Sequence, residues 1–195
     1  MSSLARAAKW GGTGLLSLVL LGTAGVYLWS SSELSATVPS PTHAFTAPTD
    51  SASIARGEHV TKALAKCADC HGEDYGGHTL VDNFPIGRLS GPILTRGQGG
   101  VTASMTDADW ERAIRHGVAA DGRRLVLMPS HEYQLMSDED VGLVIAYLRS
   151  VAPVDRQMPP TRIGPLARAL FAAGKMPLLP ANAVTHGSDV VASVT

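Results

Sequence analysis

The two cysteines of this 195-residue chain lie three positions apart, and they constrain what the chain can fold into more than any other feature. They stand in the run Cys67-Ala68-Asp69-Cys70-His71. Two cysteines are too few for a disulfide framework, and alone they cannot complete a four-thiolate zinc or iron–sulfur site. A histidine directly after C-x-x-C is instead the pattern of covalent c-type haem attachment. The run therefore predicts one haem c held by Cys67 and Cys70, with His71 as an axial ligand of the iron.

The same C-x-x-C spacing has two other interpretations. It occurs in redox disulfides, but a thioredoxin-like motif needs strand–helix–strand surroundings that this region lacks. It also occurs in zinc sites, which would need two further ligands; the candidates are His78, His116 and His131. We favour haem because two thiols at this spacing can reach both vinyl groups of one porphyrin.

Haem iron takes a second axial ligand unless that position is left open for chemistry. The candidates are Met105, Met128, Met136 and the other histidines, with His131 as the main rival in the same loop as Met128. We favour Met128 because Pro129 follows it and stiffens the chain there. Met105 and Met136 each precede a predicted helix cap, where a methionine more often packs into the core. Arg88, Tyr75 and Trp110 are candidate partners for the haem propionates.

The N-terminus has the features of an export or anchor segment. Residues 1–9 carry Arg6 and Lys9 without an acid and are expected to be a cytoplasmic n-region. Residues 10–29 are apolar, and as a helix they would cover roughly 30 Å of hydrocarbon, enough for a transmembrane anchor. The alternative is a cleaved signal peptide ending near Gly22-Thr23-Ala24. Either way the rest of the chain is exported.

Composition divides the remainder into three parts. Residues 30–53 are rich in Ser, Thr and Pro and predict a flexible tether. Residues 54–151 predict a globular helical domain, and residues 152–195 a Pro-rich extension with one short helix from Pro165 to Gly174. Within the domain the expected helices lie at 54–67, 106–117 and 137–149, and residues 72–102 are expected to form a long loop.

Charge is distributed unevenly along the chain although the net charge is −1. Residues 1–49 carry +1, residues 50–150 carry −4 and residues 151–195 carry +2. Because phosphate recognition needs an excess of Lys and Arg, an acidic domain argues against a nucleic-acid partner.

Four motifs, in this order, resemble the class I monohaem c-type cytochromes, which are small and mostly helical. They are Cys67 to His71, Gly91-Pro92-Ile93-Leu94-Thr95, Met128-Pro129 and the helix from Met136 to Arg149. The resemblance implies three main helices around one haem, with the first and last crossing at Gly57 near Tyr147. It also implies that the Pro92 carbonyl binds the His71 ring. Ile93 stands where the family pattern has Asn, which removes any hydrogen bond of that side chain.

A narrower resemblance concerns function. The run Asp121-Gly122-Arg123, followed by Met128-Pro129-Ser130, Tyr133 and residues 137–140, is similar to the membrane-anchored cytochrome c subunits of bacterial periplasmic dehydrogenases. It implies a non-catalytic, one-electron carrier on the periplasmic side of the inner membrane. A periplasmic dehydrogenase would be the donor, and an oxidase or another cytochrome of the respiratory chain the acceptor. The alternatives are a subunit that mainly tethers a dehydrogenase to the membrane, with residues 152–195 as its docking element, and a haem peroxidase or sensor with a dissociable Met128.

Overall fold

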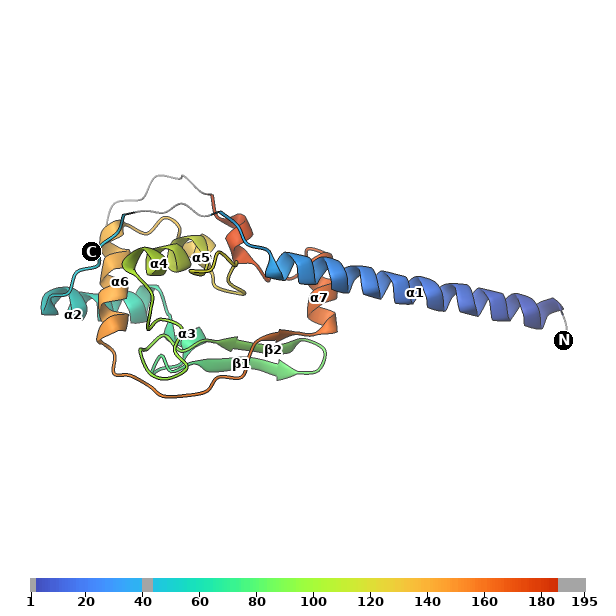
Figure 1. Ribbon diagram of the computed structural model, residues 1–195, viewed down its shortest axis with the longest axis horizontal. Helices are drawn as coiled ribbons and strands as arrows, with labels where there is room; N and C mark the ends of the chain where they lie inside the picture. The colour runs from blue at the N-terminus through green and yellow to red at the C-terminus, as the bar shows by residue number, and fades with distance from the viewer. Residues whose placement is uncertain (1–2, 40–43, 186–195) are drawn as a thin grey trace.

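The computed structural model describes residues 3–39 and 44–185, in which one long helix projects from a rounded domain (Figure 1). That helix, α1, covers Ser3–Ser35. Its part from Lys9 to Ser35 has a mean hydropathy of 1.5 and is long and apolar enough to cross a membrane, and it is the one helix of the described residues that is. The expected single N-terminal apolar helix is therefore present.

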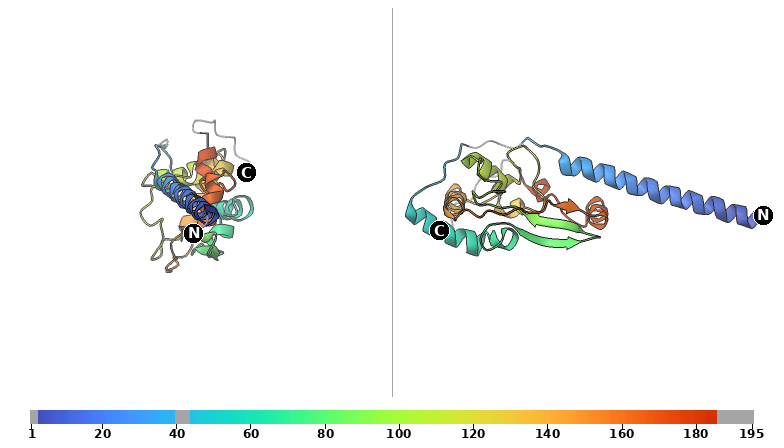
Figure 2. Two further views of the ribbon diagram at one scale, coloured as in Figure 1. Left: turned by 90° about the vertical axis from the view of Figure 1, so that its right-hand side faces the viewer. Right: turned by 60° about the horizontal axis from the view of Figure 1, so that its bottom comes forward.

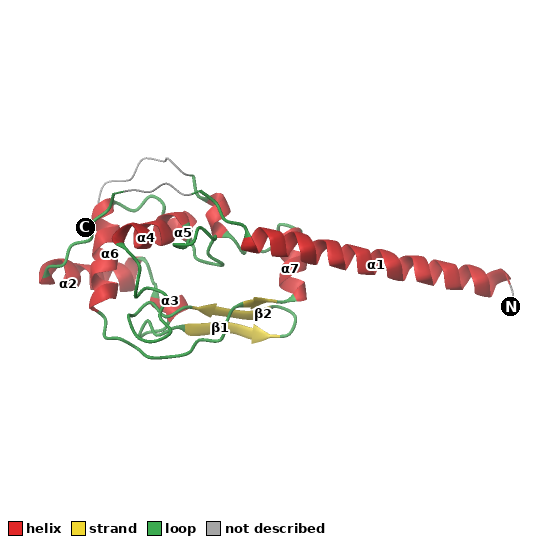
Figure 3. Cartoon of the chain, in the orientation of Figure 1, coloured by secondary structure: helices red, strands yellow, loops and turns green. Residues whose placement is uncertain are grey.

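The domain is mostly helical, as predicted, with short strands on one side (Figure 3). The three expected helices are α2 (Ser51–His59), continued by the π-helical turn η1 (Val60–Leu64), α4 (Asp107–Glu111), continued by the π-helical turn η2 (Arg112–His116), and α6 (Asp138–Ser150). Each begins at a capping side chain, respectively Asp50, Thr106 and Ser137, which accepts a hydrogen bond from a backbone N–H of the first turn. Two shorter helices are α3 (Ala68–His71) and α5 (Ser130–Tyr133).

The core forms where α2 crosses α6. A Cβ added at Gly57 would lie 2.1 Å from the Leu143 carbonyl oxygen, so only glycine permits this approach. Tyr147 lies beside the crossing, and its ring meets that of Tyr75 edge-on at 5.9 Å between centroids. The crossing implied by the resemblance is thus confirmed. The buried apolar side chains around it are Val60, Trp110, Ile114, Val141, Val144, Ile145 and Leu148.

The prediction of a long loop over residues 72–102 was wrong in its middle. Strands β1 (His78–Asn83) and β2 (Gly87–Gly91) pair as an antiparallel hairpin, and β3 (Arg162–Ile163) adds to β2. Among the large apolar side chains of the two hairpin strands, only Leu89 is buried. The sequence therefore lacks the alternation of apolar and polar residues that predicts a strand. Backbone pairing and an Asn83 turn, whose side-chain oxygen accepts from the Ile86 N–H at 3.1 Å, hold the hairpin instead.

The expected tether over residues 30–53 also differs from the structure. Residues 30–35 continue α1, and Ser30 is completely buried. Further on, Ala47 is buried in the core and its N–H donates to Asp107 Oδ2 at 2.8 Å. The described parts of this segment therefore pack on the domain. Its Ser- and Ala-rich composition predicted flexibility, but such small side chains also allow close packing.

Residues 152–185 wrap around the domain as an ordered strap (Figure 2). The expected short helix is α7 (Pro165–Ala172), with Pro165 at its first position. A 3-10 turn, η3 (Pro180–Ala183), follows it. The strap first runs beside the loop after β2, where the Arg156 N–H donates to the Gln98 carbonyl at 3.2 Å. It then passes β2 and α1 and ends against the segment containing Met128.

Candidate functional site

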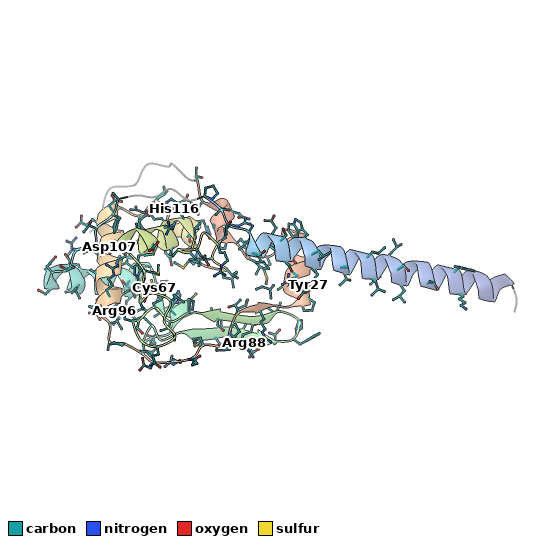
Figure 4. The ribbon with its side chains drawn as sticks, in the orientation of Figure 1. Tyr27, Cys67, Arg88, Arg96, Asp107 and His116 are labelled. Atoms are coloured by element: carbon teal, nitrogen blue, oxygen red, sulfur yellow. The ribbon has the colours of Figure 1, made fainter. Side chains whose placement is uncertain are left out.

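A sharp turn places the two cysteines at the end of the first domain helix. Lys66 has a φ of +49°, a left-handed conformation that separates η1 from the short helix α3. Cys67, which directly precedes α3, packs against the core (Figure 4). Burial raises the pKa of the Cys67 thiol to about 12 and also raises the pKa of Cys70. Both side chains are free thiols rather than a disulfide.

His71 is held in one orientation by a backbone carbonyl. Its Nδ1 lies 2.8 Å from the Pro92 oxygen, and the ring is only 9% exposed. Because a carbonyl can only accept, Nδ1 carries the hydrogen and the Nε2 lone pair is left for a ligand. Burial lowers the pKa of His71, which favours the neutral ring. A neutral imidazole with its second nitrogen fixed by a carbonyl has the arrangement of a metal-ligating histidine, and the Pro92 contact implied by the resemblance is confirmed.

The hairpin delivers Pro92 to this position. A Cβ at Gly91 would lie 1.9 Å from the Cys70 carbonyl oxygen, so the end of β2 touches the C-x-x-C-H backbone directly. Two further hydrogen bonds close the contact: Gly77 N–H to the His71 carbonyl at 2.8 Å, and Leu94 N–H to the Tyr75 carbonyl at 2.9 Å. The hairpin missed by sequence reasoning is therefore part of the support of His71.

Met128 lies in a loop that distant parts of the chain hold in place. Leu127, just before it, has a φ of +61°, and its N–H donates to the Leu178 carbonyl at 2.9 Å. On the other side, the Ser130 N–H donates to the Met128 carbonyl at 2.8 Å. The Met128 side chain is half-buried, whereas Met105 and Met136 pack against the hydrophobic core as expected.

One contact that the sequence did not reveal joins the segment after Met128 to the cysteine side. The Tyr133 hydroxyl donates to the Ala65 carbonyl at 2.7 Å, two residues before Cys67. Burial, followed by the nearby Cys67 thiol, raises the pKa of this tyrosine well above its usual range. An aromatic residue shortly after the methionine was the available signal, but nothing local indicates its partner. The structure therefore brings the Met128 segment to the side of the domain that carries the cysteines.

The zinc alternative has no ligand set in the described part of the chain. Among residues 3–39 and 44–185, no three His, Cys, Asp or Glu side chains gather as a metal site would require. His78 and His131, two of the three candidates, are exposed.

A polar cavity beside the core fits the acidic edge of a haem. It has a volume of about 290 Å³ and is lined by Arg96 and Arg149 among others. The buried indole N–H of Trp110, which also lines it, finds no hydrogen-bond partner among the described residues. An orphaned donor beside two guanidinium groups suits a carboxylate such as a haem propionate. With the fixed His71 and the two thiols, the residues therefore fit a haem c.

Comparison with known proteins gives the same class. The helical domain, the C-x-x-C-H turn and the oriented histidine define a c-type cytochrome domain. Residues 52–148 match the family described as cytochrome c oxidase, cbb3-type, subunit III. This match supports a haem-binding cytochrome c domain.

Several curated relatives are cytochrome subunits of dehydrogenases. The fructose dehydrogenase cytochrome subunit of Gluconobacter japonicus is 33% identical over 63% of this chain and 26% of its own length. The gluconate 2-dehydrogenase cytochrome c subunit of Pantoea cypripedii is 34% identical over 52% of this chain and 24% of its own. The alcohol dehydrogenase (quinone) cytochrome c subunit of Gluconacetobacter polyoxogenes is 31% identical over 55% and 25%. This chain thus spans about a quarter of the length of these relatives.

Proposed function

We propose that this chain binds one haem c covalently through Cys67 and Cys70 and transfers single electrons, with His71 and Met128 as axial ligands. The observation that carries the proposal is the 2.8 Å contact between His71 Nδ1 and the Pro92 carbonyl, beside two free thiols at haem-attachment spacing. When bound, the haem iron would supply one-electron oxidation and reduction.

The protein's part is to fix the ligands and to exclude other chemistry. Pro92 keeps the His71 ring in the tautomer that presents Nε2, and the core around Cys67 removes water from that side. A methionine thioether as second ligand raises the reduction potential and fills the position that an oxygen-binding protein leaves open. No substrate-activating group is then required, which fits an electron carrier and not an enzyme.

We assign the partners by chemistry and by the relatives' names. The donor would be a periplasmic dehydrogenase, because relatives of this domain are cytochrome subunits of fructose, gluconate and alcohol dehydrogenases. The acceptor would be an oxidase or another cytochrome of the respiratory chain. The Arg156 contact with Asp74 Oδ2 at 2.8 Å supports an extension that wraps the domain over a loose docking tail, and either role is compatible with electron transfer.

Helix α1 supports a location in a bacterial inner membrane. Arg6 and Lys9 precede its apolar stretch, so by the positive-inside rule the N-terminus would lie in the cytoplasm and the haem domain in the periplasm. Trp10 near one end of the stretch and Tyr27 with Trp29 at the other lie where interfacial aromatic residues anchor a spanning helix.

The test combines haem staining with carbon monoxide binding. The purified chain should keep haem on a denaturing gel, alternate between two spectral states with dithionite and ferricyanide, and ignore carbon monoxide when reduced. Met128→Leu should make the reduced protein bind carbon monoxide, whereas the control Met136→Leu, a core methionine, should not. Haem lost on the gel would contradict covalent attachment, and carbon monoxide binding by the unaltered chain would contradict Met128 ligation.

A further inference from the structure

An apolar and basic surface lies at the end of the domain from which α1 leaves. It consists of the turn between β1 and β2, residues 83–87, and of α7 with the residues just after it; we call it the α1-side surface. At its tip Phe84 is 87% exposed, and Leu166 on α7 is 45% exposed. Apolar side chains that are exposed together on one surface mark a candidate contact with a membrane or another molecule.

This surface is fixed to α1 by side-chain contacts. The rings of Trp29 and Phe171 lie 5.3 Å apart, and the Arg168 guanidinium sits 4.1 Å from the centre of the Tyr27 ring. Arg168 Nη1 also donates to Ser30 Oγ at 2.7 Å. Helix α7 is therefore held at the level of the aromatic residues that end the apolar stretch of α1.

Hydrogen bonds also fix the hairpin turn to α7. The Leu166 N–H donates to the Pro85 carbonyl at 2.9 Å, and the Gly164 N–H donates to the Ile86 carbonyl at 2.7 Å. Figure 1 and the right view of Figure 2 both show the turn and α7 at the α1 end of the domain, with α2 and α6 at the opposite end. The tip, α7 and α1 thus form one assembly.

Charge identifies what covers this surface. The strap from Gln157 to Thr185 contains three basic residues, Arg162, Arg168 and Lys175, and no acidic one. Residues 50–150 carry −4 by contrast. Exposed aromatic and aliphatic side chains flanked by cations are the composition of an interfacial membrane contact, and anionic lipid headgroups attract such cations.

We infer that the α1-side surface rests on the membrane, with Phe84 and Leu166 inserted among the headgroups of anionic lipids. The inference rests on the proposal that α1 spans the bilayer: if Tyr27 and Trp29 lie at the interface, α7 and the hairpin turn lie there too. The domain then has a second attachment that fixes how it faces the membrane, and its electron-exchange partners must approach from the remaining sides.

Photocrosslinking of the full chain tests this. The chain is reconstituted in nanodiscs of phosphatidylethanolamine and phosphatidylglycerol with p-benzoylphenylalanine in place of Phe84, of Leu166 or of Val101. Val101 is a matched control because it is 53% exposed, and its N–H binds the Ile93 carbonyl beyond the end of β2 opposite the turn. We expect lipid adducts at 84 and 166 several-fold above those at 101, and fewer adducts in nanodiscs of phosphatidylcholine alone.

The outcomes separate the two proposals. Nanodisc incorporation with equal lipid adducts at 84 and 101, or crosslinks from 84 to a second copy of the chain instead of lipid, would overturn the inference alone. Equal yields in anionic and zwitterionic nanodiscs would overturn its headgroup preference. Failure of the chain to enter nanodiscs would overturn the spanning role of α1 and this inference with it.

Discussion

The two sides of the candidate haem site are built from different kinds of contact. On the His71 side, the turn that carries Cys67 and Cys70 touches β2 at Gly91, and Pro92 directly binds the His71 ring. On the Met128 side, the loop is held by Leu178, fifty residues further along the chain, and its continuation is held by the Tyr133 contact with Ala65.

This difference teaches which side tolerates change. The His71 side rests on backbone contacts inside the domain and on the motif that we propose attaches the cofactor. The Met128 side depends on the strap, whose order depends in turn on α7 and α1. We therefore expect changes on the first side to abolish haem binding or folding, and changes on the second to loosen one ligand while haem stays attached.

The largest expected effect comes from removing the ligands themselves. His71→Ala should remove nearly all haem, because the imidazole that Pro92 holds beside the thiols is lost, whereas Met128→Ala should keep covalent haem and change its spectrum. Haem per polypeptide, measured by pyridine haemochrome absorbance, checks this. His59→Ala, on the exposed side of α2, is the control. Equal haem loss in His71→Ala and Met128→Ala would erase the proposed contrast between the sides.

Disrupting the contact between β2 and the C-x-x-C-H turn should have the next largest effect. Gly91→Ala places a Cβ 1.9 Å from a backbone oxygen, which only a backbone shift can relieve. We expect a loss of about 3 kcal/mol or more in the free energy of unfolding. Thermal unfolding followed by circular dichroism measures it. In Gly25→Ala the new methyl would have no atom within 4 Å, so this control should unfold like the parent; an unchanged Gly91→Ala would mean that the hairpin end is adjustable.

A cavity created in the strap by a smaller side chain should loosen the Met128 side of the site and leave the His71 side unchanged. Leu178 is fully buried, and Leu178→Ala should cost about 2–5 kcal/mol of local packing. The backbone carbonyl of residue 178, which accepts from the Leu127 N–H, stays in place but is held less firmly. We expect carbon monoxide to bind the reduced variant, with haem content unchanged. Leu166→Ala, at a half-exposed position of the same strap, is the matched control. Haem loss without carbon monoxide binding would contradict the separation of the two sides.

Some features of the two sides could be predicted from the sequence, and others could not. The helix caps Thr106 and Ser137, the haem-attachment run and the Gly57 crossing all depend on residues whose local pattern or family motif is visible, whereas the cap Asp50 was not predicted. The hairpin was missed because its side chains lie mostly at the surface, so no apolar period of two appears.

Composition predicted the strap as a separate Pro-rich segment, but it did not predict the path of this segment over the domain. Its contacts with α1, with Asp74 and with Leu127 join residues far apart in the chain, and single-sequence patterns do not encode such pairings. For the same reason residues 30–35 were predicted to be part of the tether: Ser30 is buried, and Arg168, 138 residues later, donates a hydrogen bond to it. Long-range packing, rather than local preference, decides both segments.

The smallest expected effect lies where the strap meets α1. Arg168→Gln removes the cation from the Tyr27 ring and the bonds to Ser30 and Ser31, which together should cost about 1–2 kcal/mol locally. Because α7 leads on to Leu178, we expect faster hydrogen exchange in residues 165–179 and a smaller rise in residues 125–130, but no change around His71. Arg162→Gln, an exposed arginine on β3, should leave exchange in all three segments unchanged. Faster exchange around His71 in Arg168→Gln would show that the strap supports both sides of the site, and the contrast between them would fail.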